Sequence, residues 1–133
     1  MVIFSIYIPG DVPSSKNSKV WTGRYLVHSK TATKYIKQTN SIFSNKKILK
    51  SFADAITSIE PPYKILFTFI RGSRRRFDYV NMAQMPLDLM VKHEWIVDDN
   101  ADYVIPIFKQ YLYRKECPGV IISIEKNEDN RTI

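Results

Sequence analysis

What this sequence lacks already excludes several kinds of protein. It has one cysteine, Cys117, which cannot form an internal disulfide, and its four glycines are isolated, so no glycine-rich loop can hold a nucleotide phosphate. No apolar run approaches the ~20 residues that span a bilayer, and the apolar start at residues 1–8 is too short for a signal peptide. We therefore expect a cytoplasmic protein with no nucleotide cofactor and no membrane partner.

Residues that bind zinc or calcium are also poorly represented. His28 and His93 have no Cys or His partner at the spacing of a zinc site. A calcium loop beginning at Asp98 fails because Tyr103 stands where such a loop needs glycine. Neither metal is expected at these positions.

Basic and apolar residues are abundant instead. The 133 residues carry a net charge of +7 at pH 7, and 44% of them are hydrophobic, including 13% aromatic. This is enough apolar material for the core of one domain over residues 1–133. The charge favours a polyanionic partner such as nucleic acid without establishing one.

Hydrophobic periodicity predicts a mixture of strands and helices. Alternating apolar residues, bounded by Pro, Gly and Ser, predict strands at 2–8, 63–71, 103–113 and 119–125, and a hairpin at 20–27. Helices are expected at 30–45 after the capping Ser29, at 50–59, and at 79–93. We predict an α+β fold in which two main α-helices pack on one side of a mixed or antiparallel β-sheet.

Pro86 leaves the third helix open to two interpretations. A proline inside a helix costs about 3 kcal/mol unless the helix is kinked or begins at that residue. Either the helix runs through Pro86, or it begins there and leaves Asp78 and Asn81 on a loop.

A cluster of aspartates could hold a hard metal ion. Asp78 and Asp88 are ten residues apart, which on a helix places them about 80° apart with Asn81 between them. A turn after the helix could return Asp98 and Asp99 to its start. Convergent carboxylates and an amide suit Mg²⁺, and phosphodiester cleavage uses such a site.

Four arginines precede this cluster and could hold phosphates. They are Arg71, Arg74, Arg75 and Arg76. The alternative is that these arginines cover a solvated loop and that the aspartates cap helices and turns. The sequence chemistry alone leaves both interpretations open.

Aromatic residues could add base stacking to such a site. Trp21, Tyr25 and Trp95 are candidates, but core packing is the favoured interpretation for all three. The lysines of the first helix, such as Lys34 and Lys37, are likewise interpreted as a solvated face.

Three segments together resemble the RusA-type crossover junction endodeoxyribonucleases, which are Holliday junction resolvases. The segments are Arg74-Arg75-Arg76-Phe77-Asp78-Tyr79-Val80-Asn81, Leu87-Asp88-Leu89 and Trp95-Ile96-Val97-Asp98-Asp99. The opening strand and the loop that ends in Lys16 and Asn17 are similar to the family as well. The resemblance covers most of the chain, and its specific motifs lie at 74–99.

The resemblance implies a homodimer that binds branched double-stranded DNA and nicks it with Mg²⁺, or with Mn²⁺ as a substitute, in a bacterial or phage-infected cytoplasm. It implies that Asp78, Asp98, Asp99 and Asn81 hold the metal, that Asp88 lines the same catalytic site, and that the four arginines, Lys16 and Asn17 contact DNA.

Two residues depart from the family pattern. Val80 stands where a second ligating Asp is expected, and Gln84 stands where a catalytic Lys is expected. The alternatives are therefore a protein that binds DNA junctions but has lost cleavage, and a basic structural protein with no nucleic-acid role.

Overall fold

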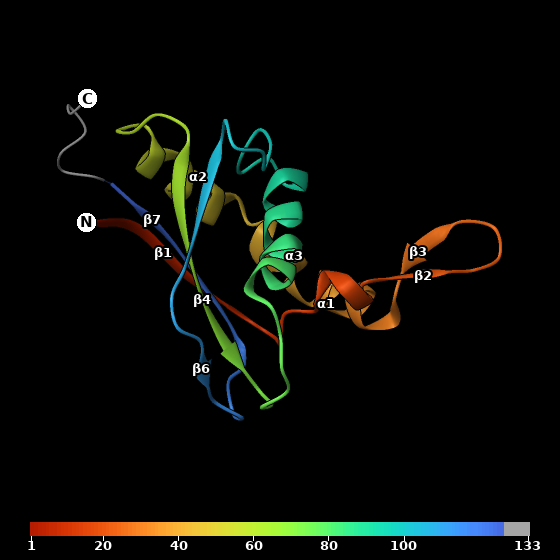
Figure 1. The fold of residues 1–133 in the computed structure, drawn as a ribbon. Helices are drawn as coiled ribbons and strands as arrows, with labels where there is room; N and C mark the ends of the chain where they lie inside the picture. Colours follow the sequence, from red (N-terminus) through yellow and green to blue (C-terminus); the bar gives the residue numbers. More distant parts are fainter. Residues whose placement is uncertain (127–133) are drawn as a thin grey trace.

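A mixed five-stranded sheet forms the body of the computed structural model, which describes residues 1–126 (Figure 1). Its strands are β1 (Val2–Pro9), β4 (Tyr63–Arg71), β5 (Val104–Phe108), β6 (Leu112–Tyr113) and β7 (Gly119–Glu125). They lie in the order β1-β7-β4-β5, and β6 pairs with β4 beyond the end of β5. The β1–β7 and β7–β4 pairs are antiparallel, while β5 and β6 are parallel to β4. The predicted α+β class with a mixed sheet is confirmed.

One face of the sheet carries most of the core. Phe67 on β4 pairs with Ile122 on β7, which in turn pairs with Ile6 on β1. The same cross-strand rows repeat above and below, so every second residue of each strand contributes to one apolar face. Ser5 and Ser123 lie on the opposite face, where their hydroxyl oxygens are 3.1 Å apart.

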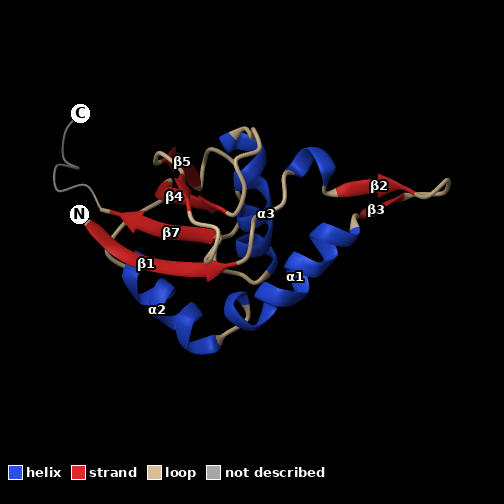
Figure 2. Ribbon diagram, turned by 90° about the horizontal axis from the view of Figure 1, so that it is seen from below, coloured by secondary structure: helices blue, strands red, loops and turns tan. Residues whose placement is uncertain are grey.

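Three α-helices in the described residues pack on the apolar face: α1 (Lys30–Phe43), α2 (Lys46–Ile56) and α3 (Tyr79–Lys92) (Figure 2). The Ser29 hydroxyl caps α1 by accepting from the Ala32 N–H, as its sequence position predicts. Asn45 caps α2 by accepting from Lys47 and Ile48, so this helix begins earlier than the predicted 50–59. None of the helices in residues 1–126 has the length and apolar character that a membrane span requires.

Helix α3 runs through Pro86 without ending there. Asp78 is its N-cap residue, and the helix continues for 14 residues to Lys92. The interpretation in which the helix begins at Pro86 is therefore wrong. The ring of Pro86 is fully buried, and it lies among the apolar residues that α3 turns toward the sheet.

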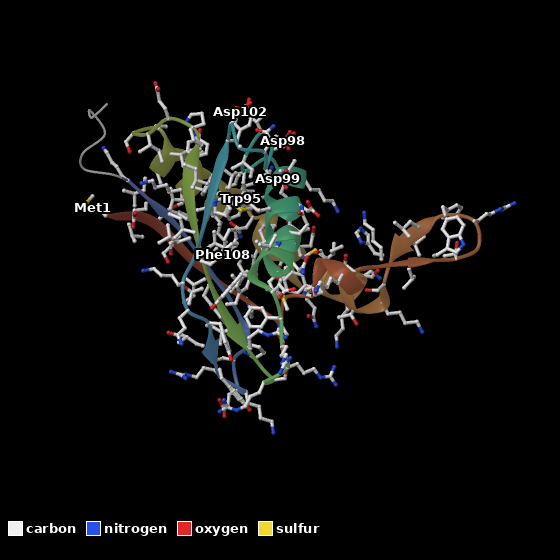
Figure 3. All side chains as sticks on the ribbon, viewed as in Figure 1. Met1, Trp95, Asp98, Asp99, Asp102 and Phe108 are labelled. Atoms are coloured by element: carbon white, nitrogen blue, oxygen red, sulfur yellow. The ribbon has the colours of Figure 1, made fainter. Side chains whose placement is uncertain are left out.

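An aromatic cluster fixes the turn that follows α3. Trp95 is 3% exposed, packs near Phe4, Phe43 and Phe52, and donates its indole N–H to the Phe43 carbonyl at 2.8 Å (Figure 3). Glu94, immediately before it, has a φ of 64° and turns the chain out of the helix. The predicted core role of Trp95 is confirmed, and the turn brings Asp98 and Asp99 back beside α3.

A two-stranded hairpin projects away from this body (Figures 1 and 2). The short 3-10 helix η1 (Ser15–Asn17) leads into strands β2 (Lys19–Trp21) and β3 (Leu26–His28). The predicted hairpin is confirmed, but its aromatic residues are not in the core. Trp21 is 67% exposed and Tyr25 is 61% exposed, so the favoured interpretation was wrong for both.

The single strand predicted at 103–113 is divided into β5 and β6. Between them, Lys109 donates its backbone N–H to the Phe67 carbonyl and Tyr111 donates its N–H to the Tyr79 hydroxyl. A side chain from the first residue of α3 therefore bonds to the sheet edge where the strand is interrupted.

Candidate functional site

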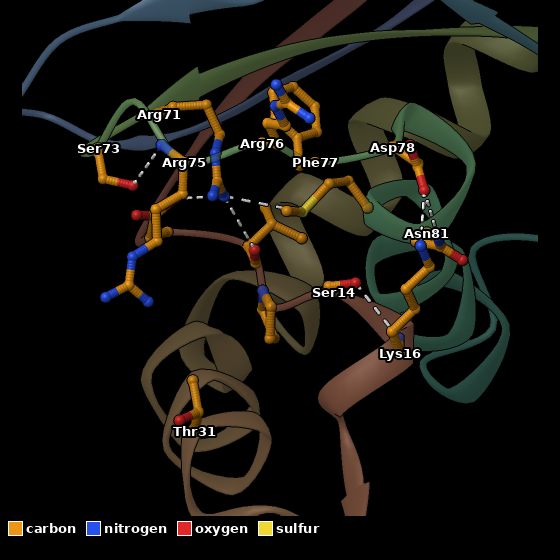
Figure 4. A pocket seen from close by; sticks show the side chains of 14 residues that line it. Ser14, Lys16, Thr31, Arg71, Ser73, Arg75, Arg76, Phe77, Asp78 and Asn81 are labelled. Atoms are coloured by element: carbon orange, nitrogen blue, oxygen red, sulfur yellow. Dashed lines mark hydrogen bonds and ion pairs between the residues drawn. The ribbon is translucent and has the colours of Figure 1, made fainter.

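A cleft of about 740 Å³ lies where the loop after β1, the start of α1, the segment after β4 and the start of α3 meet (Figure 4). Its walls carry cationic and hydroxyl side chains together with the carboxylates of Asp11 and of Asp78, the N-cap residue of α3. Lining residues include Ser14, Lys16, Thr31, Arg71, Ser73, Arg75, Arg76, Asp78 and Asn81.

The side chain of Arg71 is largely buried and contacts other residues of the protein. Its side chain is only 10% exposed, and Nη1 lies 2.9 Å from the Asp11 carboxylate. The guanidinium also lies 4.9 Å from the centre of the Phe77 ring, and its Nη1 is 3.7 Å from the sulfur of Met82. Arg71 thus ties the loop after β1 to the start of α3, and its contact with DNA stays a prediction.

The other three arginines are exposed. Arg75 and Arg76 line the cleft, whereas Arg74 lies outside its lining with its guanidinium 4.2 Å from the centre of the Tyr113 ring. Three of the four predicted arginines therefore line the cleft, but Arg71 is paired with Asp11, so Arg75 and Arg76 are the two that are exposed in it.

Asp78 is tied to the N-terminal loop at the start of α3. Lys16 Nζ lies 2.8 Å from Asp78 Oδ2, and Asn81 Nδ2 donates to the same oxygen at 3.3 Å. The hydrogen bond and charge of Lys16 lower the pKa of Asp78. Ser15 holds Asn81 in turn, by donating its hydroxyl to Oδ1 at 3.0 Å. The side chain of Asn17, which was predicted to contact DNA, lies outside the part of the structure described.

A pair of carboxylates, those of Asp88 and Asp99, lies further along the exposed face of α3. Gln84 Nε2 donates to Asp88 Oδ1 at 2.6 Å and to Asp99 Oδ2 at 3.2 Å, so one amide nitrogen holds both carboxylates. Asn81, Gln84 and Asp88 are spaced at i, i+3 and i+7, which places them in one stripe of the helix. Within residues 1–126, no cationic side chain lies within ion-pair distance of Asp88 or Asp99.

The carboxylate of Asp98 accepts hydrogen bonds within the turn after α3. One of its oxygens accepts the N–H of Asp99 at 2.7 Å, and the other accepts from Asn100 Nδ2 at 3.1 Å. Asp98 therefore shapes the turn that presents Asp99, although the sequence assigned both residues to the metal site.

The acidic residues form two separate groups. In the described chain, no three residues among His, Cys, Asp and Glu are grouped closely enough to hold a metal ion together. The donor set of Asp88 and Asp99 nevertheless fits a hard divalent cation, because Mg²⁺ is commonly bound by one or two carboxylates while water and substrate phosphates complete its shell.

Sequence reasoning missed the role of Gln84. It was noted only as a departure from the family, yet it joins the two carboxylates. The i, i+4 spacing of Gln84 and Asp88 could have predicted half of this contact. The contact to Asp99 depends on the turn at Glu94 and had no local signal.

Comparison with known proteins identifies no relative of this chain. No protein-family model matches the sequence, and a search of curated proteins finds no match either. The resemblance to RusA-type endonucleases consequently stays a prediction from the motifs at 74–99.

Proposed function

We propose that this protein is a Mg²⁺-dependent endonuclease of the RusA type that binds and nicks branched DNA as a homodimer. The observation that carries the proposal is the pair of carboxylates, Asp88 and Asp99, held on one amide with no cationic side chain of residues 1–126 in ion-pair distance. Asp88 lies on α3, and the turn after the helix brings Asp99 beside it; at the N-terminal end of the same helix, next to Asp78, a cationic cleft opens.

The cleft is suited to phosphate groups. Lys16, Arg75 and Arg76 supply positive charge along its walls, and Ser14, Thr31 and Ser73 supply hydroxyl groups. Phosphate contacts of this kind position a nucleic acid without reading its sequence. DNA held there would run along the start of α3 toward the acidic pair.

Asp88 and Asp99 are the residues that would hold the metal ion. A bound Mg²⁺ lowers the pKa of an attacking water and neutralises charge on the leaving oxygen. Gln84 keeps the two carboxylates together, and a half-turn of its amide would present an oxygen in place of the nitrogen. Asp78, already paired with Lys16, is placed to orient groups at the cleft.

A junction-binding protein without cleavage is the second candidate, favoured by one observation. Val80 is 72% exposed at the position where the family pattern has a ligating carboxylate, so the acidic group lacks a third member. Under this proposal the cleft binds DNA while the pair Asp88 and Asp99 holds no productive metal.

Incubation of the purified protein with a labelled four-way junction and Mg²⁺ or Mn²⁺ tests the first proposal. We expect symmetric nicks that Asp99→Asn and Asp78→Asn reduce. Asp54→Asn is the matched control, because Asp54 is an exposed aspartate on α2 that pairs with Lys50 and lies outside the lining of the cleft. Absence of metal-dependent nicks, or equal nicking by Asp99→Asn and the control, would reject cleavage.

Binding measured in EDTA separates the remaining candidates. Junction affinity that persists in EDTA, without nicking when metal is added, supports the binding protein. Phosphate contacts require that affinity fall steeply with salt. A protein with no salt-sensitive DNA affinity would instead be a basic structural protein.

A further inference from the structure

We propose that the β2–β3 hairpin is a nucleic-acid-binding element that stacks Trp21 and Tyr25 on unpaired bases. This rests on the proposed function only in taking nucleic acid as the partner, and it does not require cleavage. The hairpin extends from the body beside η1, whose Lys16 and Ser15 contact the start of α3 (Figure 1).

The tip of the hairpin carries two aromatic rings next to its turn. Trp21, the last residue of β2, pairs with Leu26, and just beyond the two strands Thr22 donates its backbone N–H to the Tyr25 carbonyl at 3.1 Å. Gly23, with a φ of 91°, and Arg24 form the turn between them. The tip therefore combines an indole, a phenol and an arginine within residues 21–25.

These rings are unusually exposed for a protein with a well-filled core. Trp21 and Tyr25 are both more than 60% exposed, whereas Trp95 is buried. Val20 and Leu26 are also exposed, so the hairpin has no core of its own to which the aromatic rings contribute. Exposed tryptophan and tyrosine on a projecting ribbon are suited to contact a flat partner.

The charge around the hairpin selects a polyanion as that partner. No acidic residue occurs between Asp11 and Asp54, a stretch that contains the hairpin, α1 and the start of α2. Nine basic residues lie in it: Lys16, Lys19, Arg24, Lys30, Lys34, Lys37, Lys46, Lys47 and Lys50. A protein partner is disfavoured, because the cores of protein interfaces are depleted of lysine.

A hollow connects the hairpin to the lysines of α1. It is lined by His28, the last residue of β3, together with Lys30, Lys34 and Lys37. A strand whose bases stack at the hairpin tip could therefore pass its phosphates along α1. Stacking on aromatic rings combined with a cationic track is a general way to bind single strands.

Unpaired bases are the expected ligand because a duplex hides the faces of its bases except at ends, nicks and branch points. Both rings need such a face to stack. The hairpin would therefore favour single strands or opened branch points over continuous duplex, while the cleft arginines contact phosphates of either form.

Tryptophan fluorescence tests this directly, since the chain has only Trp21 and the buried Trp95. The full-length protein is titrated in EDTA with a single-stranded oligonucleotide and with a duplex of the same length. We expect quenching by the single strand. Trp21→Phe, which leaves only Trp95, should show almost none while keeping its affinity, because phenylalanine still stacks.

Affinity measurements complete the test. Trp21→Ala and Tyr25→Ala should each lower the affinity for the single strand about tenfold, while Val2→Ala, an exposed apolar control on β1, changes nothing. The far-ultraviolet spectrum and Trp95 emission show whether each variant is folded. If an alanine variant misfolds, the quenching difference between the wild type and Trp21→Phe decides.

The proposal is overturned if a folded Trp21→Ala variant has the same single-strand affinity as the wild type. If that variant also shifts from dimer to monomer in sedimentation, the hairpin would instead bind a second copy of the chain. Absence of nicking with quenching retained rejects only the endonuclease, whereas nicking without any effect of Trp21 rejects only the hairpin proposal.

Discussion

The two acidic groups of the α3 face differ in how their charge is compensated. At the start of the helix, Asp78 is paired with Lys16 at 2.8 Å. Nearly three turns further along, Asp88 shares one neutral amide, that of Gln84, with Asp99. The first group is neutral as a whole, and the second carries two negative charges.

This difference indicates where a cation would bind. Two like charges at about 4 Å repel each other by about 1 kcal/mol in water, and by more near a protein surface. A divalent cation would relieve that repulsion at Asp88 and Asp99, but at Asp78 it would have to compete with Lys16. Four predictions break or sharpen this contrast.

Removal of the carboxylates of Asp88 and Asp99 should have the largest effect on nicking. In Asp88→Asn with Asp99→Asn, we expect nicking of a four-way junction to fall about a hundredfold or more, and Mg²⁺ binding by calorimetry to be lost. Asp78→Asn should lower nicking less, by about tenfold. Because repulsion is removed, the melting temperature of the double variant should be unchanged or higher. A larger loss of nicking in Asp78→Asn than in the double variant would assign the metal site to Asp78 instead.

Addition of a third carboxylate should strengthen the second group. Val80 lies one helical turn before Gln84, so Val80→Asp places a carboxylate beside the amide that joins Asp88 and Asp99. We expect Mg²⁺ affinity by calorimetry to rise several-fold. Val2→Asp, which adds the same charge at another exposed valine, should not raise it. Equal effects of the two substitutions would point to net charge alone.

Removal of Lys16 should make the first group resemble the second. In Lys16→Met the pKa of Asp78 should rise toward its usual value, as measured by carboxyl NMR titration. Because the pKa of Asp78 is lower in the folded protein, the ionised carboxylate stabilises the wild type at pH values above its usual pKa, and this contribution is lost as the pH falls through the pKa in the folded state. The unfolding free energy of Lys16→Met should therefore fall less steeply than that of the wild type as the pH is lowered. An unchanged pKa would show that Lys16 does not hold Asp78 in solution.

The smallest effect is expected at Ser15, which holds Asn81 and touches no acidic group directly. Ser15→Ala removes one partly buried hydrogen bond, which costs about 1 kcal/mol of stability. Nicking should change by no more than a few-fold. A loss as large as that of Asp99→Asn would show that Asn81 must be held for the reaction itself.

Much of the fold was predictable because it depends on local patterns. Alternation of apolar residues located β1, β4 and β7, and Ser29 marked the start of α1. The start of α2 was placed too late because Asn45, a cap as good as Ser29, was overlooked. The interruption between β5 and β6 was not predicted; within it Tyr111 donates its N–H to the hydroxyl of Tyr79, a residue distant in the sequence.

The site was less predictable because residue type does not determine which way a side chain turns. Arg71 and Arg75 look alike in the sequence, yet the side chain of Arg71 is buried against Asp11 and that of Arg75 is exposed in the cleft. Asp98 and Asp99 are neighbours, yet one closes a turn and the other meets Gln84. Trp21 and Trp95 differ most of all, because one lies on a projecting ribbon and the other in the core.

The inward position of Arg71 has a consequence for how tightly a ligand could bind. Its contacts with Asp11, Phe77 and Met82 join two walls of the cleft to the end of β4. These walls are ordered when the chain folds, so a ligand does not have to order them on arrival. Such preorganisation lowers the entropic cost of association, and it leaves the exposed arginine segment at 74–76 as the part that adapts to the incoming phosphates.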